Sequence, residues 1–200
     1  MTCWIVIPAK APSIAKGRLA EALPNIAREA LASAMLDHVI RAVMQANTGA
    51  TVAIVGAAPA QLAENIITLP EPGGGLNSAL ASVRQSLAGQ NACRMISLAA
   101  DLPLLEPSDV LSLLALPPRV VGIAPDRHGT GTNALSLPLP QAADFTYSYG
   151  PGSFDRHVAE ARRLHLEFQT VVTPGLARDI DEPADLGDIT HWLAGEEGQA

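Results

Sequence analysis

The chain has 200 residues, of which 48% are hydrophobic and 16% charged, and its formal net charge is −7. This composition is sufficient for one sizeable core, whereas the negative charge disfavours nucleic acid and anionic membranes as partners. No run reaches the roughly 20 apolar residues of a membrane span, and no signal-peptide pattern is present. We therefore expect a cytoplasmic protein in which Cys3 and Cys93 are reduced core residues.

The apolar patterns alternate between strand-like and helix-like along the chain. Continuous or alternating apolar runs predict strands at 3–8, 51–55, 66–69, 94–99, 120–124, 132–137 and 166–172. Helical spacing predicts helices at 24–47, 59–65, 76–87, 107–114, 153–164 and 184–193. Loops or irregular segments are expected at 9–20, 70–75 and 138–152. The alternation predicts one α/β domain over 1–195, with a mostly parallel sheet between two helical layers and a disordered tail at 196–200.

Open α/β sheets bind their ligands beyond the carboxyl ends of the strands. The first such segment, 9–20, contains Lys10, Lys16 and Arg18, and the two lysines are the only ones in the chain. Lysine and arginine side chains bind phosphate oxygens. The loop is therefore predicted to bind a polyphosphate, although it has neither the P-loop nor the GxGxxG pattern. A merely solvated basic loop is the alternative interpretation.

A second segment, Gly73-Gly74-Gly75-Leu76-Asn77, precedes the helix at 76–87. Consecutive glycines let a backbone approach a ligand closely, and Asn77 would then lie at the helix N-terminus. The alternative is an ordinary connection in which the asparagine caps the helix.

Three carboxylates follow predicted strands. Asp101 ends the apolar run at 95–100, where a carboxylate is costly unless it is solvated, caps a turn or binds a ligand. Asp179 and Asp181 alternate in an extended segment and point to the same side. Together they predict a magnesium site, because Mg²⁺ prefers carboxylates combined with phosphate oxygens and water. Capping of the next turn by Asp101, and of the last helix by Asp181, are the alternatives.

Two further segments, 129–133 and 149–153, are rich in glycine and hydroxyl residues. Their backbone N–H groups could surround an anionic substrate. A hairpin turn for the first and an N-cap at Ser153 for the second are the alternative interpretations.

Six motifs in order carry a resemblance to a known family. They are IPAKAPSIAKGRL, GGGLNSAL, AADLPLL, GTGTNAL, YGPGSF and DIDEPADL. The chain thereby resembles, nearly end to end, the 2-phospho-L-lactate and phosphoenolpyruvate guanylyltransferases of coenzyme F-420 biosynthesis. Gly17 departs from the pattern, because a serine is common at this position; the change removes a hydroxyl near the phosphates.

The resemblance implies a three-layer nucleotidyltransferase fold (GT-A-like and Rossmann-like), related to molybdenum-cofactor guanylyltransferases, and the use of GTP and Mg²⁺. It implies triphosphate and catalytic roles for Lys10, Lys16 and Arg18, nucleotide contacts for Gly75 and Asn77, metal ligation by Asp101, Asp179 and Asp181, a catalytic role for Asp101, and acceptor binding by Thr132, Gly150 and Ser153. The acceptor would be 2-phospho-L-lactate, phosphoenolpyruvate or 3-phospho-D-glycerate, and a homodimer is compatible with the family.

The implied reaction is in-line attack of the acceptor phosphate on the α-phosphorus of GTP, with release of pyrophosphate. It needs no general base, because the attacking oxygen is already ionised at pH 7, and we expect His128 and His157 to be bystanders or carboxylate anchors. Two alternatives remain: a molybdopterin guanylyl- or cytidylyltransferase, which typically opens with a glycine-rich loop where this chain has Pro8 to Pro12, and a non-catalytic nucleotide-binding domain.

Overall fold

The computed structural model describes residues 2–189 of the chain. The strands are β1 (Thr2–Ala9), β2 (Thr51–Gly56), β3 (Ile66–Leu69), β4 (Ala92–Leu98), β5 (Val121–Pro125), β6 (Thr132–Pro138) and β7 (Phe168–Thr170). The α-helices are α1 (Asn25–Gln45), α2 (Gly75–Ala88), α3 (Pro107–Leu114), α4 (Ser153–Arg163) and α5 (Pro174–Ala177). The 3-10 helices are η1 (Pro12–Ile14), η2 (Gly17–Glu21) and η3 (Pro183–Ile189).

The strands form one sheet in the order β3-β2-β1-β4-β6-β5-β7. All pairs are parallel except those of β6, which runs antiparallel to β4 and to β5. The connection from β5 to β6 is the short turn at 126–131, whereas a parallel crossover needs a dozen or more residues. The predicted mostly parallel α/β sheet is therefore confirmed, with one reversed strand.

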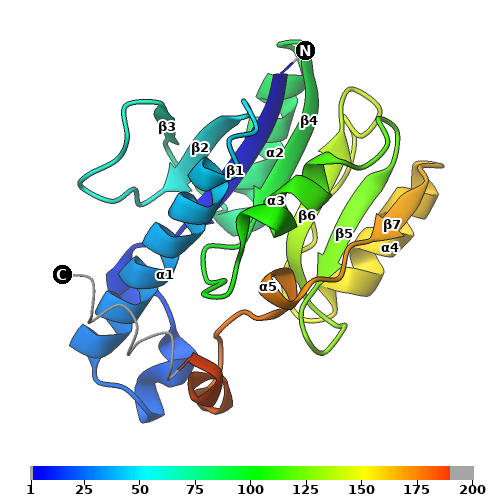
Figure 1. Cartoon of the computed structure of the whole chain (residues 1–200). Coiled ribbons are helices and arrows are strands. Elements are labelled where there is room, and N and C mark those ends of the chain that lie inside the picture. Colours follow the sequence, from blue (N-terminus) through cyan, green and yellow to red (C-terminus); the bar gives the residue numbers. More distant parts are fainter. Residues whose placement is uncertain (1, 190–200) are drawn as a thin grey trace.

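The sheet lies between two layers of helices (Figure 1). Helices α1 and α3 cover one face, and α2 and α4 cover the other. Strand β1 shows why the sequence requires two layers, because Ile5, Val6 and Ile7 are all fully buried. Ile5 and Ile7 contribute to the core beneath α1, whereas Val6 contributes to the core beneath α2. A strand buried on both faces is continuously apolar rather than alternating.

A third and smaller apolar cluster lies beside the carboxyl end of β1. Its buried members come from η2, α1 and the segment at 180–189, and they are Leu19, Leu31, Met35, Ile180 and Ile189. This cluster holds the loop after β1 against a segment from late in the chain. It therefore fixes two of the three segments in which the sequence predicts charged site residues.

Some predicted elements differ from the structure. Residues 59–65 form no helix, because only Pro59 and Leu62 in this segment are even half-buried and a short helix without tertiary packing is marginal. The predicted last helix is the 3-10 helix η3, and its predicted end at 190–193 lies outside the described residues, as does the predicted tail. Helix α5 was not predicted, although Thr173 caps it and Pro174 occupies its first position. Within residues 2–189, no helix is long and apolar enough to cross a membrane.

Candidate nucleotide and phosphate site

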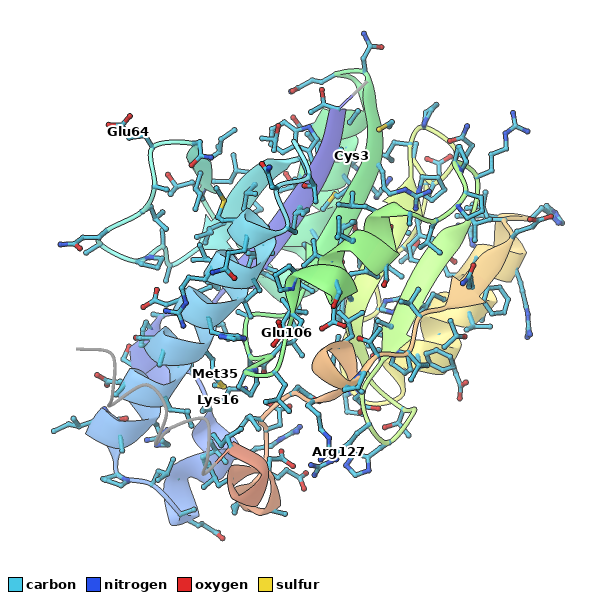
Figure 2. The ribbon with its side chains drawn as sticks, viewed as in Figure 1. Cys3, Lys16, Met35, Glu64, Glu106 and Arg127 are labelled. Carbon is cyan, nitrogen blue, oxygen red and sulfur yellow. The ribbon has the colours of Figure 1, made fainter. Side chains whose placement is uncertain are left out.

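A cavity of about 740 Å³ lies at the end of the sheet where β1 and β4 terminate. Its wall includes every predicted site residue except Asn77, namely Lys10, Lys16, Arg18, Gly75, Asp101, Thr132, Gly150, Ser153, Asp179 and Asp181. Figure 2 shows Lys16 and Arg127 at this end of the molecule and Cys3 at the opposite end. Residues chosen because they follow the carboxyl ends of strands thus line one continuous cavity.

Lys16 is the central cation of the cavity. Its Nζ donates to Oδ2 of Asp101 and, over 3.1 Å, to Oδ1 of Asp181. The side chain is only 7% exposed. Burial by itself lowers the pKa of Lys16, but the two carboxylates outweigh this effect and the net pKa is raised. Its backbone is left-handed, with φ 55°, a conformation that costs a residue other than glycine about 1 kcal/mol.

The other two cations of the loop are more exposed. Nη1 of Arg18 lies 3.6 Å from Oδ2 of Asp181, and the arginine side chain is 66% exposed. Lys10 is exposed at the other end of the loop, also on the cavity wall. Both side chains can therefore turn toward an anion in the cavity.

Asp179 and Asp181 lie on the cavity side of their segment, as the alternation predicts, because Ile180 between them is buried in the third cluster. Nδ2 of Asn133 donates to Oδ1 of Asp179 over 3.1 Å. The pKa of Asp179 is raised to about 6, first by burial and then by the negative charge of Asp101. Asn133 opposes this rise, since its amide stabilises the ionised form.

The chemistry of these carboxylates fits a divalent cation only in part. Asp101 and Asp179 are hard oxygen donors whose mutual repulsion a cation would relieve, which suits Mg²⁺ held by one or two carboxylates and phosphate oxygens. Asp181, however, is held by Lys16 and Arg18. Among residues 2–189, no group of three or more His, Cys, Asp or Glu side chains is arranged to hold a metal ion. The three-carboxylate site stays a prediction.

Thr132, Gly150 and Ser153 meet at the other side of the cavity. The backbone N–H of Ser148 donates to Nε2 of His157 over 3.0 Å, so Nδ1 carries the imidazole proton and donates to Oγ1 of Thr132, also 3.0 Å away. The Thr132 hydroxyl proton thus remains available to a ligand. Gly150 has φ 122°, which strongly favours glycine.

His157 is neither a carboxylate anchor nor a charged group. It is fully buried, and its pKa is lowered to about 4 by burial first and by the positive charge of Arg156 second, while Glu160 opposes the shift. At neutral pH it is therefore an uncharged support for Thr132. Its place in a site could not be inferred from its position in the helical pattern of α4.

Asn77 is not part of the cavity wall and binds the neighbouring loop. Its Oδ1 accepts from the backbone N–H of Tyr149 over 2.8 Å, and its Nδ2 donates to the Tyr149 carbonyl over 3.3 Å. The Tyr149 hydroxyl in turn lies 2.7 Å from Oγ of Ser97 on β4. The predicted contact of Asn77 with the nucleotide stays a prediction, whereas its contact with the loop that carries Gly150 is a finding.

Two rim residues were not singled out from the sequence. Arg127, in the turn between β5 and β6, forms an ion pair with Asp185 in η3. Oδ2 of Asp185 also accepts from the backbone N–H groups of Asp181 and Glu182, over 2.8 and 2.7 Å. Asp185 thus holds the turn after Asp181. The spacing of Asp185, three and four positions after Glu182 and Asp181, is typical of such a cap and could have been recognised in the sequence.

The sequence is similar to proteins of one named family along nearly its whole length. A family model described as "Guanylyl transferase CofC like" matches residues 3–200. The phosphoenolpyruvate guanylyltransferase of Sphaerobacter thermophilus is 38% identical over 194 residues, which cover 94% of this chain and 93% of that protein. The enzyme of the same name from Chloroflexus aggregans is 39% identical over 191 residues, covering 91% and 94%.

Solved structures show the same architecture at low sequence identity. A putative nucleotide-diphospho-sugar transferase from Desulfovibrio desulfuricans matches with a TM-score of 0.74 at 17% identity, covering 94% of this chain and 87% of that one. A nucleotidyl transferase from Methanothermobacter thermautotroptrophicus matches with a TM-score of 0.64 at 14% identity, covering 97% and 99%. Together with the sheet order, these matches confirm the predicted nucleotidyltransferase fold.

Proposed function

The chain belongs to the guanylyl transferase CofC-like family and is a guanylyltransferase, and from this premise we propose that it transfers GMP from GTP to phosphoenolpyruvate and releases pyrophosphate. The names of the two relatives reported above support this acceptor, since both are named phosphoenolpyruvate guanylyltransferases. The proposal includes Mg²⁺ as cofactor and a place in coenzyme F-420 biosynthesis. The observation that carries it is one cavity lined by a basic loop, three carboxylates and a hydroxyl-rich pocket.

The order of strands supports a division of the cavity between two substrates. Lys10, Lys16 and Arg18 follow β1, and Asp101 follows β4, which is the neighbour of β1. Thr132 begins β6, the next strand in the sheet. We assign the basic loop to the β- and γ-phosphates of GTP, and the pocket at Thr132, Gly150 and Ser153 to the acceptor acid. The α-phosphorus then lies between them, beside Asp101.

In this arrangement the residues bind and orient rather than form covalent bonds. Lys10, Lys16 and Arg18 neutralise the charge that grows on the leaving pyrophosphate. Asp101 and Asp179 would hold Mg²⁺, which when bound screens the repulsion between two anionic substrates. The Thr132 hydroxyl donates to the acceptor, because its oxygen already accepts from His157. Alignment of the two phosphates supplies much of the remaining rate enhancement.

The experiment is a transfer assay with the full chain, GTP, MgCl₂ and one acid at a time. Phosphoenolpyruvate, 2-phospho-L-lactate and 3-phospho-D-glycerate are compared, and products are identified by mass alongside pyrophosphate release. We expect the guanylylated adduct of phosphoenolpyruvate to form fastest, and CTP or ATP to replace GTP poorly. If an adduct forms with one of the other two acids and not with phosphoenolpyruvate, that acid is the acceptor. If no adduct forms with any of the three acids, the proposal is wrong.

A molybdopterin guanylyl- or cytidylyltransferase is the rival within the same fold. The loop after β1 argues against it, because Pro8 and Pro12 flank Lys10 where such enzymes typically carry glycines. A non-catalytic nucleotide-binding domain would bind GTP in the same assay but release no pyrophosphate when the acid is added.

A further inference from the structure

Lys16 lies between Asp101, to which the proposed function assigns a divalent cation, and Asp181. Its Nζ contacts Asp101 and Asp181 at once, and the side chain is almost completely enclosed. By contrast, Lys10 pairs with none of the three carboxylates within residues 2–189, although it lines the same cavity. Of the two lysines in the chain, one is therefore the internal counter-ion of the site and the other is exposed beside it.

Both of these carboxylates have cationic partners before any substrate binds. Asp101 pairs with Lys16, and Asp181 pairs with Lys16 and Arg18. A divalent cation that entered alone would lie beside the buried ammonium and would be repelled by it. If it expelled the ammonium instead, Lys16 would lose two ion-pair partners in a poorly solvated place and gain none.

A triphosphate removes this obstacle because it brings its own negative charge to the same loop. Lys16 lies between Lys10 and Arg18 in sequence, and all three residues line the same cavity. Phosphate oxygens bound by Lys10 and Arg18 would therefore lie near Lys16. The ammonium can then exchange carboxylate oxygens for phosphate oxygens, which are equally good partners. Asp101 and Asp181 are released at that moment, and a divalent cation can take the place of the ammonium.

We infer that Lys16 is the resident counter-ion of the Asp101–Asp181 pair, and that its exchange onto the triphosphate makes the divalent cation bind together with the nucleotide and not before it. This inference rests on the proposed function for the identity of the two ligands. It adds an order of binding and a second role for Lys16, beyond contact with the leaving group.

The first test uses the unaltered protein, because a chain with two lysines gives only two lysine side-chain NMR signals. The protein is labelled with ¹³C at lysine Cε, and the variant Lys10→Arg assigns the signals. We expect MgCl₂ alone to leave the Lys16 signal in place, and inorganic tripolyphosphate with MgCl₂ to shift it. A shift to the position of the exposed Lys10 signal with MgCl₂ alone would overturn the inference, as would no shift under any condition.

The second test measures Mn²⁺ binding without nucleotide, from the EPR signal of free Mn²⁺. We expect Lys16→Gln to bind Mn²⁺ at least about tenfold more tightly than the wild type, because the competing charge is gone, and the added change Asp101→Asn to abolish this gain. Lys10→Gln is the matched control for this measurement alone: without nucleotide it should bind Mn²⁺ as tightly as the wild type, because Lys10 pairs with none of the three carboxylates within the described residues. Equal affinities in the wild type and Lys16→Gln would overturn the inference. Thermal melting confirms that each variant is folded, and the NMR test decides if Lys16→Gln is not.

The two proposals fail separately. Guanylyl transfer by the wild type, combined with equal Mn²⁺ affinities, would reject the counter-ion role and leave the proposed function standing. Tighter Mn²⁺ binding by Lys16→Gln, combined with no transfer to any acid, would do the reverse.

Discussion

At the scale of single residues, the cavity separates ionised groups from neutral ones. Lys16 is held charged by its ion pairs with Asp101 and Asp181, which raise its pKa. His157, fully buried behind Thr132, is held neutral because its surroundings do not solvate a charge. The side of the cavity assigned to the triphosphate is thus electrostatic, whereas the acceptor side depends on hydrogen bonds. Each side predicts a different response to substitution.

Asp101→Asn tests the electrostatic side. The change keeps the shape of the side chain but removes the charge that pairs with Lys16 and would bind the cation. We expect guanylyl transfer to fall by about 100-fold or more, with little change in melting temperature. Asp144→Asn is the matched control, since Asp144 is exposed outside the cavity wall. A fully active Asp101→Asn enzyme would reject the metal and catalytic assignment.

His157→Gln tests the side of the cavity at Thr132, where the histidine is uncharged, through the pH dependence of stability. Because the pKa of His157 is about 4 in the folded protein and 6.5 for a solvated histidine, the unfolded chain binds the proton first as pH falls. The contribution of His157 to the free energy of unfolding is therefore complete above pH 6.5 and is lost as pH falls toward 4. The free energy lost over this range is about 3 kcal/mol. Glutamine can make the same two hydrogen bonds without titrating.

The measurement is the free energy of unfolding by urea at several pH values for both proteins. The quantity of interest is the difference between wild type and variant, because other titrating groups, such as Asp179 with its raised pKa, are present in both. We expect this difference to change by about 3 kcal/mol between pH 7 and pH 4 in favour of the variant. Parallel pH profiles would show that His157 is not held neutral by the fold.

At the scale of elements, the site depends on segments that meet from distant parts of the chain. The loop after β1 and the segment at 180–189 are fixed to each other through the apolar cluster that contains Leu19 and Ile180. The N-terminal turn of α2 is fixed to the loop before α4 through Asn77 and Tyr149. The second connection makes Asn77 a positioning residue for the loop that carries Gly150, on the side of the cavity that we assign to the acceptor.

Asn77→Ala should therefore affect the two substrates unequally. Loss of two hydrogen bonds to Tyr149, each worth about 1 kcal/mol, loosens the loop that carries Gly150. We expect KM for the acceptor acid to rise about tenfold, with KM for GTP changing less than about twofold. Gln85→Ala, exposed on the same helix, is the control. An equal rise of KM for GTP would support the nucleotide contact that the sequence suggested for Asn77.

These connections mark the limit of prediction from sequence. The placement of Lys10, Lys16, Arg18 and the carboxylates on one cavity could be predicted because they follow strands, and the sheet brings the ends of strands together. The partner of Asn77 lies 72 positions away in an irregular segment, and no local periodicity encodes such a pairing. The ion pairs of Lys16 were missed for the same reason, since they join residues 85 and 165 positions apart. The local sequence pattern was sufficient to predict most helices and strands, whereas the side-chain partners of Asn77 and Lys16 depend on tertiary contacts.

At the scale of the whole molecule, the two ends of the sheet have different tasks. The cavity lies where β4 ends, whereas Arg94 lies near where β4 begins and is 4% exposed. Its guanidinium donates to the carbonyls of Leu116, Pro117 and Val120 and to Oγ of Ser136. One buried side chain thus joins β4 to β6 and to the connection between α3 and β5.

Arg94→Met should separate stability from catalysis. The variant leaves four acceptors without their donor, three of them in the buried residues Leu116, Val120 and Ser136, so we expect the free energy of unfolding to fall by about 3 kcal/mol or more. Transfer activity per folded molecule should not change, since Arg94 does not line the cavity. Arg119→Met, exposed in the same region, is the control. Urea denaturation and activity measured below the transition decide the matter, and an unchanged stability would contradict the bridging role.

The cluster that joins Leu19 to Ile180 and Ile189 has a consequence for the protein while it is being made. Lys16 leaves the ribosome early, but Asp181, its partner 165 positions later, is among the last described residues to be translated. A nascent chain can form β1 and α1 long before the carboxylates of the site can be assembled. If the site is as proposed, joint binding of triphosphate and cation begins only after synthesis has passed Ile189.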